Sequence, residues 1–243
     1  MPAYISHTVM ARDVYNKIKN KEVNKDYMVT FSLGGDLSKY SKCRKDSHNI
    51  LLNEFIYNMC DYMKDNNLTH DGECLGVLYG HICHFIMDTT IHPLIWKVTK
   101  VCEKNKKNHT FIEMYYDYYL LKKHHNLRTN KYKNSEMLKG KINKKVKDLL
   151  NETYKKTYKC DNLSRYYKFN LWLYRKIRIL YVLFPFNFLK KVVGMSSFLK
   201  KNKDIDLLNE NKNIEYKDLN ELYDISVNKA IEYISEVNEY LYK

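Results

Sequence analysis

Residues 79 to 96, YGHICHFIMDTTIHPLIW, form the most apolar helical run in the first half of the chain. Within it, His84, Asp88 and His92 follow one another at intervals of four residues. In a helix this spacing places the three side chains on one side, and His81 joins that side three residues before His84. A carboxylate in an apolar helix is costly unless it is paired or binds a metal ion. The stretch therefore predicts a core helix that also carries a polar site.

The composition of the chain favours long helices over many short strands. Among 243 residues only seven are glycine and three are proline, so few turns are marked by these residues. The 44% of apolar residues is enough to build a sizeable core. No segment shows the two-residue alternation of a half-buried strand. We therefore predict an all-α protein, a multi-helix bundle in one domain over residues 1–243, with a basic helical segment at about 121–203.

Helical periodicity and capping residues place the individual helices. We expect a short helix that ends at Gly34-Gly35, before a loop that starts at Asp36. Because a proline disfavours helical geometry in the preceding residue, the helix that begins near residue 70 should end at about His92, before Pro93. Together with this helix, the helices that we expect have an apolar or amphipathic pattern. They span about 7–20, 47–64, 70–92, 109–125, 135–158, 162–184 and 218–241.

The net charge of +14 is concentrated in one part of the chain. Residues 121–203 carry 23 basic and 4 acidic residues, whereas residues 1–120 carry 15 basic and 14 acidic residues. A basic block of this kind attracts phosphates, whether in nucleic acid or on an anionic membrane surface. A solvated helical surface in a lysine-rich sequence explains the same charge. Both interpretations stay open at this point.

Targeting signals and membrane-spanning runs are not visible in the sequence. The longest apolar run outside the opening stretch, ILYVLFPFNFL at 179–189, is shorter than a span and is broken by Pro185 and Asn187. We therefore expect a soluble, cytoplasmic protein. Its six cysteines, none of them in a C-x-x-C pair, should then be reduced thiols.

More imidazoles and carboxylates lie before and after the opening stretch. His109 and Glu113 repeat the four-residue step on another expected helix. His7 lies at the start of the first helix, Asp36 follows the double glycine, and His48 lies at the start of the next helix. Zinc accepts such nitrogen and oxygen ligands, and ligands on different helices can converge across a bundle. The pattern indicates a metal site, with hydrogen-bonded core histidines as the alternative.

The order of these residues resembles the bacterial zinc-dependent phospholipase C family, whose all-helical fold is shared with single-strand-specific zinc nucleases. The segments that carry the resemblance are MPAYISH, GGD, DSHN, GHICHFIMDTTIHP and HTFIE, together with the closing DLNELYDISVNKAIEYI. They cover residue 1 to about residue 117 and the last helix, whereas residues 125–215 resemble nothing specific. The D-x-x-x-HP spacing is similar to the intracellular branch of the family.

The resemblance implies a cluster of three zinc ions that hydrolyses a phosphodiester with a metal-bound hydroxide. Asp36 and Asp88 would be the catalytic residues: Asp88 would bridge two ions, and Asp36 would also orient the attacking water. His81 would lie behind the ligands. The implied ligands are imidazoles, carboxylates and the amino terminus that remains after removal of Met1: Pro2, His7, Asp36, His48, His84, Asp88, His92, His109 and Glu113.

The substrate cannot be chosen from the ligands, because related folds cleave phospholipids or single-stranded nucleic acids with the same metals. The aromatic stretch YYKFNLWLYRKIRILYVLFPF, residues 166–186, is a core stripe, a lipid-facing surface or a base-stacking surface. The resemblance favours a phospholipase C-like hydrolase with a phospholipid or other phosphodiester substrate and an anionic membrane surface as partners. The alternatives are a nuclease-like zinc enzyme that binds nucleic acid and a non-catalytic basic module that binds anionic surfaces.

Overall fold

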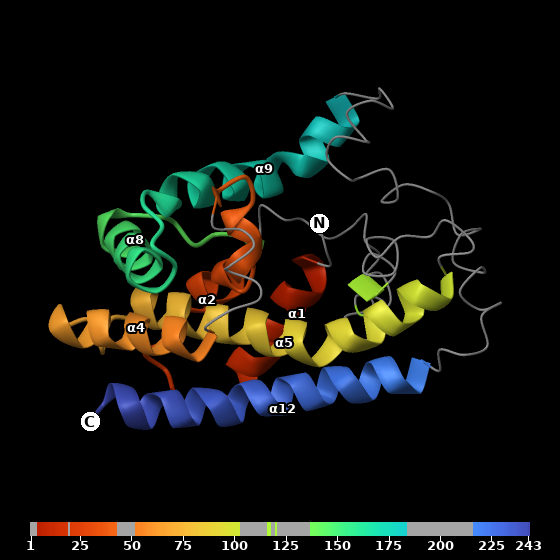
Figure 1. Ribbon diagram of the computed structural model, residues 1–243, viewed down its shortest axis with the longest axis horizontal. Coiled ribbons are helices and arrows are strands. Elements are labelled where there is room, and N and C mark those ends of the chain that lie inside the picture. The colour runs from red at the N-terminus through yellow and green to blue at the C-terminus, as the bar shows by residue number, and fades with distance from the viewer. Residues whose placement is uncertain are drawn as a thin grey trace.

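The computed structural model describes residues 4–18, 20–42, 52–102, 116–117, 120, 137–183 and 216–243. Within these ranges it contains seven α-helices, one 3₁₀ helix and no strand, which confirms the all-α class (Figure 1). The elements follow one another along the chain in this order: α1 (Tyr4–Lys17), α2 (Lys25–Phe31), η1 (Gly34–Ser38), α4 (Leu52–Asp65), α5 (Gly72–Cys102), α8 (Lys144–Tyr158), α9 (Leu163–Leu183) and α12 (Tyr216–Leu241).

The opening stretch lies in α5, the central helix of the bundle, which contacts α1, α2, α4, α8 and α12. Figure 1 shows α12 running alongside α5 over much of its length. By length and composition alone, the segment Gly72–Ile95 of α5 could cross a membrane. Most of this segment is buried against the other helices, so its apolar character is explained by its position in the core.

The expectation that this helix ends at His92 is wrong, because α5 continues through Pro93 to Cys102. A proline inside a helix removes one backbone hydrogen bond and costs about 3 kcal/mol. Ile91 and Ile95, on either side of Pro93, are only 2% and 3% exposed. Full burial of one such side chain contributes about 1.5–3 kcal/mol, so keeping the helical phase across Pro93 offsets the cost of the proline.

Glycines on one face of α5 allow α2 to approach closely. A Cβ atom on Gly76 would lie 2.7 Å from the carbonyl oxygen of Asn24, and one on Gly80 would lie 2.7 Å from the carbonyl oxygen of Met28. Such distances are shorter than any side chain tolerates, so the two helices touch through their backbones. Since α2 leads directly into η1, this contact fixes the position of Asp36 relative to α5.

Hydrogen bonds from α9 hold η1 from a second direction. The Tyr167 hydroxyl donates to the carbonyl oxygen of Gly34 at 2.9 Å. The Asn170 side-chain amide donates to the carbonyl oxygens of Leu37 and Lys39 at 2.9 and 2.8 Å. The helix expected to end at Gly34-Gly35 ends instead at Phe31, and the loop expected to start at Asp36 is a 3₁₀ helix whose backbone is fastened to α9.

The remaining helix predictions differ from the structure mainly at their ends. The helices expected at about 7–20, 162–184 and 218–241 are present as α1, α9 and α12. The helix expected at about 135–158 is α8, which begins at Lys144, and that expected at about 47–64 is α4, described from Leu52. Most of the helix expected at about 109–125 lies outside the described residues.

The cysteines do not all match the expectation of reduced thiols. Cys60, Cys74 and Cys83 are free and buried. Cys160, which follows the end of α8, is disulfide-bonded, so the expectation is wrong at this position. The described part of the chain therefore combines three buried thiols with one oxidised cysteine.

Candidate metal centre

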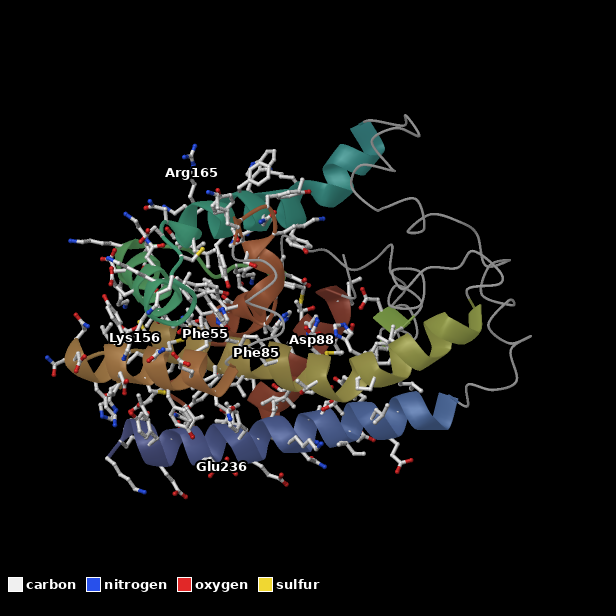
Figure 2. All side chains as sticks on the ribbon, viewed as in Figure 1. Phe55, Phe85, Asp88, Lys156, Arg165 and Glu236 are labelled. Atoms are coloured by element: carbon white, nitrogen blue, oxygen red, sulfur yellow. The ribbon has the colours of Figure 1, made fainter. Side chains whose placement is uncertain are left out.

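Five polar side chains from three elements meet in the interior of the bundle. His7 comes from α1 and Asp36 from η1, while His84, Asp88 and His92 come from α5. One ligand atom each of His7, Asp36 and His84 can be chosen so that all three lie within 4.8 Å of one another, and the three residues are buried. In Figure 2 the Asp88 side chain lies where α5 and α1 meet. The other predicted ligands lie outside the described residues: Pro2, His48, His109 and Glu113.

The Asp88 carboxylate faces three imidazoles. Its Oδ1 lies 3.3 Å from Nε2 of His7 and 3.6 Å from Nε2 of His92, and its Oδ2 lies 3.4 Å from Nε2 of His84. Charge-assisted N–H···O bonds are usually shorter, about 2.7–2.9 Å. Neighbouring ligands on a tetrahedral zinc ion, with bonds of about 2.0–2.1 Å, lie about 3.3 Å apart. The donor spacing therefore fits ligands arranged around cations better than it fits direct hydrogen bonds.

The orientation of His84 is set by a backbone carbonyl. Its Nδ1 lies 3.1 Å from the carbonyl oxygen of Ser32. Because a carbonyl oxygen only accepts hydrogen bonds, Nδ1 carries the hydrogen, and the neutral ring presents the Nε2 lone pair to Oδ2 of Asp88. A lone pair and a carboxylate oxygen repel each other unless a proton or a metal ion lies between them. This backbone contact is the usual way in which a protein orients a histidine ligand.

The first glycine of the GGD motif is required by the same imidazole. Gly34 has a φ of +35°, and a Cβ atom at this position would lie 2.5 Å from Cγ of His84 and 2.6 Å from its Cδ2. The ring therefore lies directly against the backbone of η1. Two residues later, Asp36 extends from that backbone into the cluster. Close approach of η1 to α5 at Gly34 is thus what brings Asp36 and His84 together.

Electrostatics keep the Asp88 carboxylate ionised. Burial by itself raises the pKa of Asp88, but its attraction to the imidazoles of His84, His7 and His92 when these rings are protonated, together with the contact with His7, outweighs burial, so the pKa lies well below its usual range. For His7, burial lowers the pKa, whereas its hydrogen bond to Asp88 and the carboxylates of Asp88 and Asp36 raise it above the usual value. The centre therefore attracts cations strongly, whether they are protons or metal ions.

Asp117 holds the first turn of α1 in place. Its Oδ1 accepts hydrogen bonds from the backbone N–H of Ser6 at 2.7 Å and from the Ser6 hydroxyl at 2.6 Å, and its Oδ2 accepts from the N–H of Ile5 at 3.3 Å. N–H groups in the first turn of a helix have no partner within the helix, and a carboxylate there also complements the positive end of the helix dipole. Since His7 follows Ser6 directly, Asp117 positions the helix turn that delivers His7.

Sequence reasoning assigned no role to Asp117. Its signal was present, because His109, Glu113 and Asp117 continue the same four-residue spacing. The spacing could not predict the hydrogen-bond partner of Asp117, because Ser6 lies 111 residues away in the chain. Burial raises the pKa of Asp117 to about 7, although its hydrogen bonds from Ser6 and Ile5 act in the opposite direction.

His81, by contrast, is a hydrogen-bonded core residue. Its Nδ1 donates to the carbonyl oxygen of Val77 at 2.8 Å, and its Nε2 lies 3.1 Å from the Tyr167 hydroxyl. Burial lowers its pKa to about 4, so the ring is neutral at pH 7. Through Tyr167, which also bonds to Gly34, His81 supports the position of η1 behind the cluster.

The described residues fit zinc by chemistry as well as by spacing. The cluster offers three imidazoles and two carboxylates, which are the ligand types of catalytic zinc sites. In addition, Nδ1 of His7 is buried and has no hydrogen-bond partner within the described ranges. Buried polar atoms without a partner are rare in folded proteins, and a bound ion or water is one of the usual reasons for them.

Comparisons with known proteins are consistent with this geometry. A model of the family described as zinc dependent phospholipase C matches residues 1–160. The match covers every residue of the candidate centre and extends beyond about residue 117, where the resemblance in the first half of the sequence was expected to stop. Neither the comparison with curated proteins nor that with solved structures gives a match.

Proposed function

Because the chain belongs to the zinc dependent phospholipase C family, we propose that it cleaves phospholipids at a centre that holds three zinc ions. Membership makes the protein a zinc-dependent phosphodiester hydrolase, and phospholipid is the substrate that the family implies. The number of ions and the residues that bind them are our proposal. The observation that carries it is the Asp88 carboxylate, which faces three imidazole nitrogens at 3.3–3.6 Å.

The proposed ligands divide into three groups. Asp36, His48, His84 and Asp88 would bind one ion. Asp88 would also reach a second ion, which His7 and the amino group of Pro2 complete after removal of Met1. The third ion, more open to substrate, would be bound by the remaining residues: His92, His109 and Glu113. The described residues support the first two groups, since donor atoms of His7, Asp36 and His84 lie within 4.8 Å of one another.

When bound, zinc lowers the pKa of coordinated water to about 7 and offsets the negative charge that develops on the phosphoryl oxygens. The protein contributes orientation and proton handling. The Ser32 carbonyl keeps the Nδ1 proton of His84 in place, so that Nε2 can act as a donor to the ion. The carboxylate of Asp36, which is buried beside the cluster, would orient the attacking water and accept its proton. For a phospholipid, the products would be diacylglycerol and a phosphorylated head group.

Elemental analysis of the purified, tag-free protein tests the centre. We expect about three zinc ions per chain. Asp88→Asn should lose zinc and lower the hydrolysis rate by more than about 10²-fold, because removing a group that only supports a metal ligand already costs about 10–100-fold. Asp65→Asn is a matched control, because Asp65 is an exposed aspartate on α4 and should keep full zinc content. Full activity of the Asp88→Asn protein would remove the cluster from the mechanism.

A substrate panel tests the phospholipid assignment against the nuclease alternative. The panel contains phosphatidylcholine, an anionic phospholipid, single-stranded DNA and a chromogenic phosphodiester. The proposal expects release of diacylglycerol from at least one lipid. Cleavage of DNA without cleavage of either lipid would select the nuclease, and zinc-free protein that only binds anionic surfaces would select the non-catalytic module.

The location of the enzyme and its place in the intracellular branch remain part of the proposal. The D-x-x-x-HP spacing at Asp88, His92 and Pro93 supports that branch, and the free thiols of the described chain suit a cytoplasmic protein. The disulfide at Cys160 argues in the other direction, since disulfides persist in oxidising compartments. Thiol labelling of the protein in intact cells, followed by intact-mass measurement, tests the oxidation state and the removal of Met1 together. A Cys160 that stays disulfide-bonded in the cell would contradict a cytoplasmic location.

A further inference from the structure

Three exposed aromatic side chains form a continuous surface beside η1. Tyr40, Phe169 and Trp172 are 55%, 52% and 51% exposed, the highest values for large hydrophobic side chains within the described ranges. The ring centroids of Tyr40 and Phe169 lie 6.3 Å apart, as do those of Phe169 and Trp172. Single exposed hydrophobic residues are normal, but a contiguous group marks a site of interaction.

Helix α9 contains most of the aromatic stretch of residues 166–186, for which the sequence left three interpretations open. The residues of this helix lie on two different faces. Tyr167, Leu171 and Tyr174 are buried, which accounts for the core stripe. The opposite face combines two aromatic rings with cations, and its exposed members follow helical spacing: Arg165, Lys168, Phe169, Trp172 and Lys176. Residues 163–183 contain no acidic residue. Figure 2 shows the Arg165 side chain pointing away from the bundle.

Aromatic rings flanked by lysine and arginine suit the interface of an anionic bilayer. Trp and Phe side chains lie at the level of the lipid headgroups, and nearby cations bind the lipid phosphates and the negative surface. Base stacking on nucleic acid requires a free ring face instead. Phe169 packs against the rings of both Tyr40 and Trp172, so its apolar bulk is presented as part of a cluster and not as an open platform.

The surface is fastened to the segment that carries Asp36. Tyr40 follows Asp36 by four residues, and the Lys39 ammonium lies 5.2 Å from the centre of the Tyr40 ring. Asn170, which lies between Phe169 and Trp172 on α9, donates a hydrogen bond to the carbonyl oxygen of Lys39. A membrane in contact with the aromatic rings would therefore lie beside the element that brings Asp36 to the metal centre.

We propose that this aromatic–basic patch is the surface through which the protein docks on an anionic lipid bilayer. The patch is defined by six residues: Tyr40, Arg165, Lys168, Phe169, Trp172 and Lys176. The purpose of docking rests on the proposed phospholipase function, because it brings the metal centre to a substrate that resides in membranes. Binding itself requires only the exposed rings and the cations around them.

A fluorescence experiment tests docking directly. The chain has two tryptophans, Trp96 and Trp172, so Trp96→Phe leaves Trp172 as the reporter. Vesicles of phosphatidylcholine with about one third phosphatidylserine should shift the Trp172 emission to shorter wavelengths, and salt should weaken the effect. Pure phosphatidylcholine vesicles should bind roughly tenfold more weakly, because they lack the negative surface. An unchanged emission spectrum with anionic vesicles, together with no co-sedimentation, would overturn the proposal.

Paired variants locate the binding surface. Phe169→Ser with Trp172→Ser should lower co-sedimentation of the full-length, zinc-loaded protein with anionic vesicles by roughly tenfold. Tyr240→Ser with Tyr242→Ser is the matched control, because these are also exposed aromatic residues but lie at the end of the chain, on and after α12. Circular dichroism confirms that both proteins are folded. Equal loss of vesicle binding in both variants, or loss in the control alone, would overturn the proposal.

Hydrolysis rates separate this inference from the proposed function. The Phe169→Ser, Trp172→Ser protein should lose activity on anionic vesicles relative to its activity on a soluble chromogenic phosphodiester. A parent protein that docks through the patch but hydrolyses no phosphodiester contradicts the proposed function and supports the docking surface. If the double variant loses binding to single-stranded DNA and keeps its binding to vesicles, the patch recognises nucleic acid and the docking proposal fails.

Discussion

The two halves of α5 are built in opposite ways. The first half has glycines at the contact with α2: Gly76 and Gly80 let the backbone of α2 touch the helix directly. The second half has polar side chains inside the bundle, with His84 and Asp88 facing residues from α1 and η1. The close contact of the first half with α2 therefore determines where the candidate ligands of the second half meet Asp36 of η1.

The largest effect is expected where the backbone contact is broken. Gly80→Val would place a branched Cβ atom 2.7 Å from the carbonyl oxygen of Met28 and 2.7 Å from the carbonyl carbon of Phe31. Overpacking against main chain that cannot move aside should lower the free energy of unfolding by about 3 kcal/mol or more. Urea denaturation measures the loss. Thr90→Val, which introduces the same side chain at a partly exposed position of α5, should change the free energy by less than about 1 kcal/mol.

Gly34→Ala should impair zinc binding by the second half of α5 more than it lowers the stability of the fold. A Cβ atom there meets the His84 ring, and the positive φ adds strain of about 1–3 kcal/mol for a residue other than glycine. We expect the zinc content and the hydrolysis rate to fall together, the latter by at least about tenfold. Gly72→Ala is the control, since its Cβ atom would also meet a backbone atom, the carbonyl oxygen of Glu22, but it lies at the start of α5, away from the centre. It should lose stability and keep its zinc, and an equal loss of zinc in both variants would contradict this interpretation.

Asp117→Asn tests the protonation of the carboxyl group that holds the first turn of α1, next to His7. The pKa of Asp117 is about 7 in the folded protein and about 3.9 in an unfolded chain, so the folded state binds more protons between these values. Stability should therefore fall as the pH rises through that window. The variant has no such proton, so its stability relative to the parent should increase from about pH 5 to pH 8, by roughly 1–3 kcal/mol. Denaturation curves at both pH values measure the difference, and a parallel pH dependence of the two proteins would contradict it.

Pro93→Ala should have the smallest effect, and one of opposite sign. Alanine restores a backbone hydrogen bond and is the best helix former, while the unfolded chain gains some freedom. The net result should be a gain of about 1 kcal/mol, visible as a melting temperature a few degrees higher. Because Ile91 and Ile95 already hold the helix across this position, zinc content should not change. A loss of stability would show that the proline itself shapes the helix.

The spacing of His84, Asp88 and His92 was enough to predict their common helix and their common site, because both depend only on helical periodicity. The convergence of His7 and Asp36 on this site was not available from spacing and came from the family resemblance. Pro93 shows the limit of local rules: the preference of His92 for extended backbone is real, but the burial of Ile91 and Ile95 overrides it.

Contacts between distant segments account for what the sequence did not reveal. Gly34 could be recognised as a turn residue, but its contact with His84 depends on two elements 50 residues apart in the chain. Asp117 continued the spacing of the ligands, yet its role follows from its bonds to Ser6 and Ile5. The division of α9 into a buried and an exposed face likewise depends on η1, against which α9 packs.

The bond between His84 and Ser32 has a consequence for how this protein can vary. The atom that accepts the proton of Nδ1 is a main-chain oxygen, which every amino acid at position 32 would also provide. Substitution at Ser32 can therefore alter packing without deleting the acceptor, and the proton stays on the same ring nitrogen for as long as the backbone keeps its path. The chemical state of His84 is thus protected against mutation of the residue that it touches, and it is vulnerable at the distant glycines that set the course of the chain.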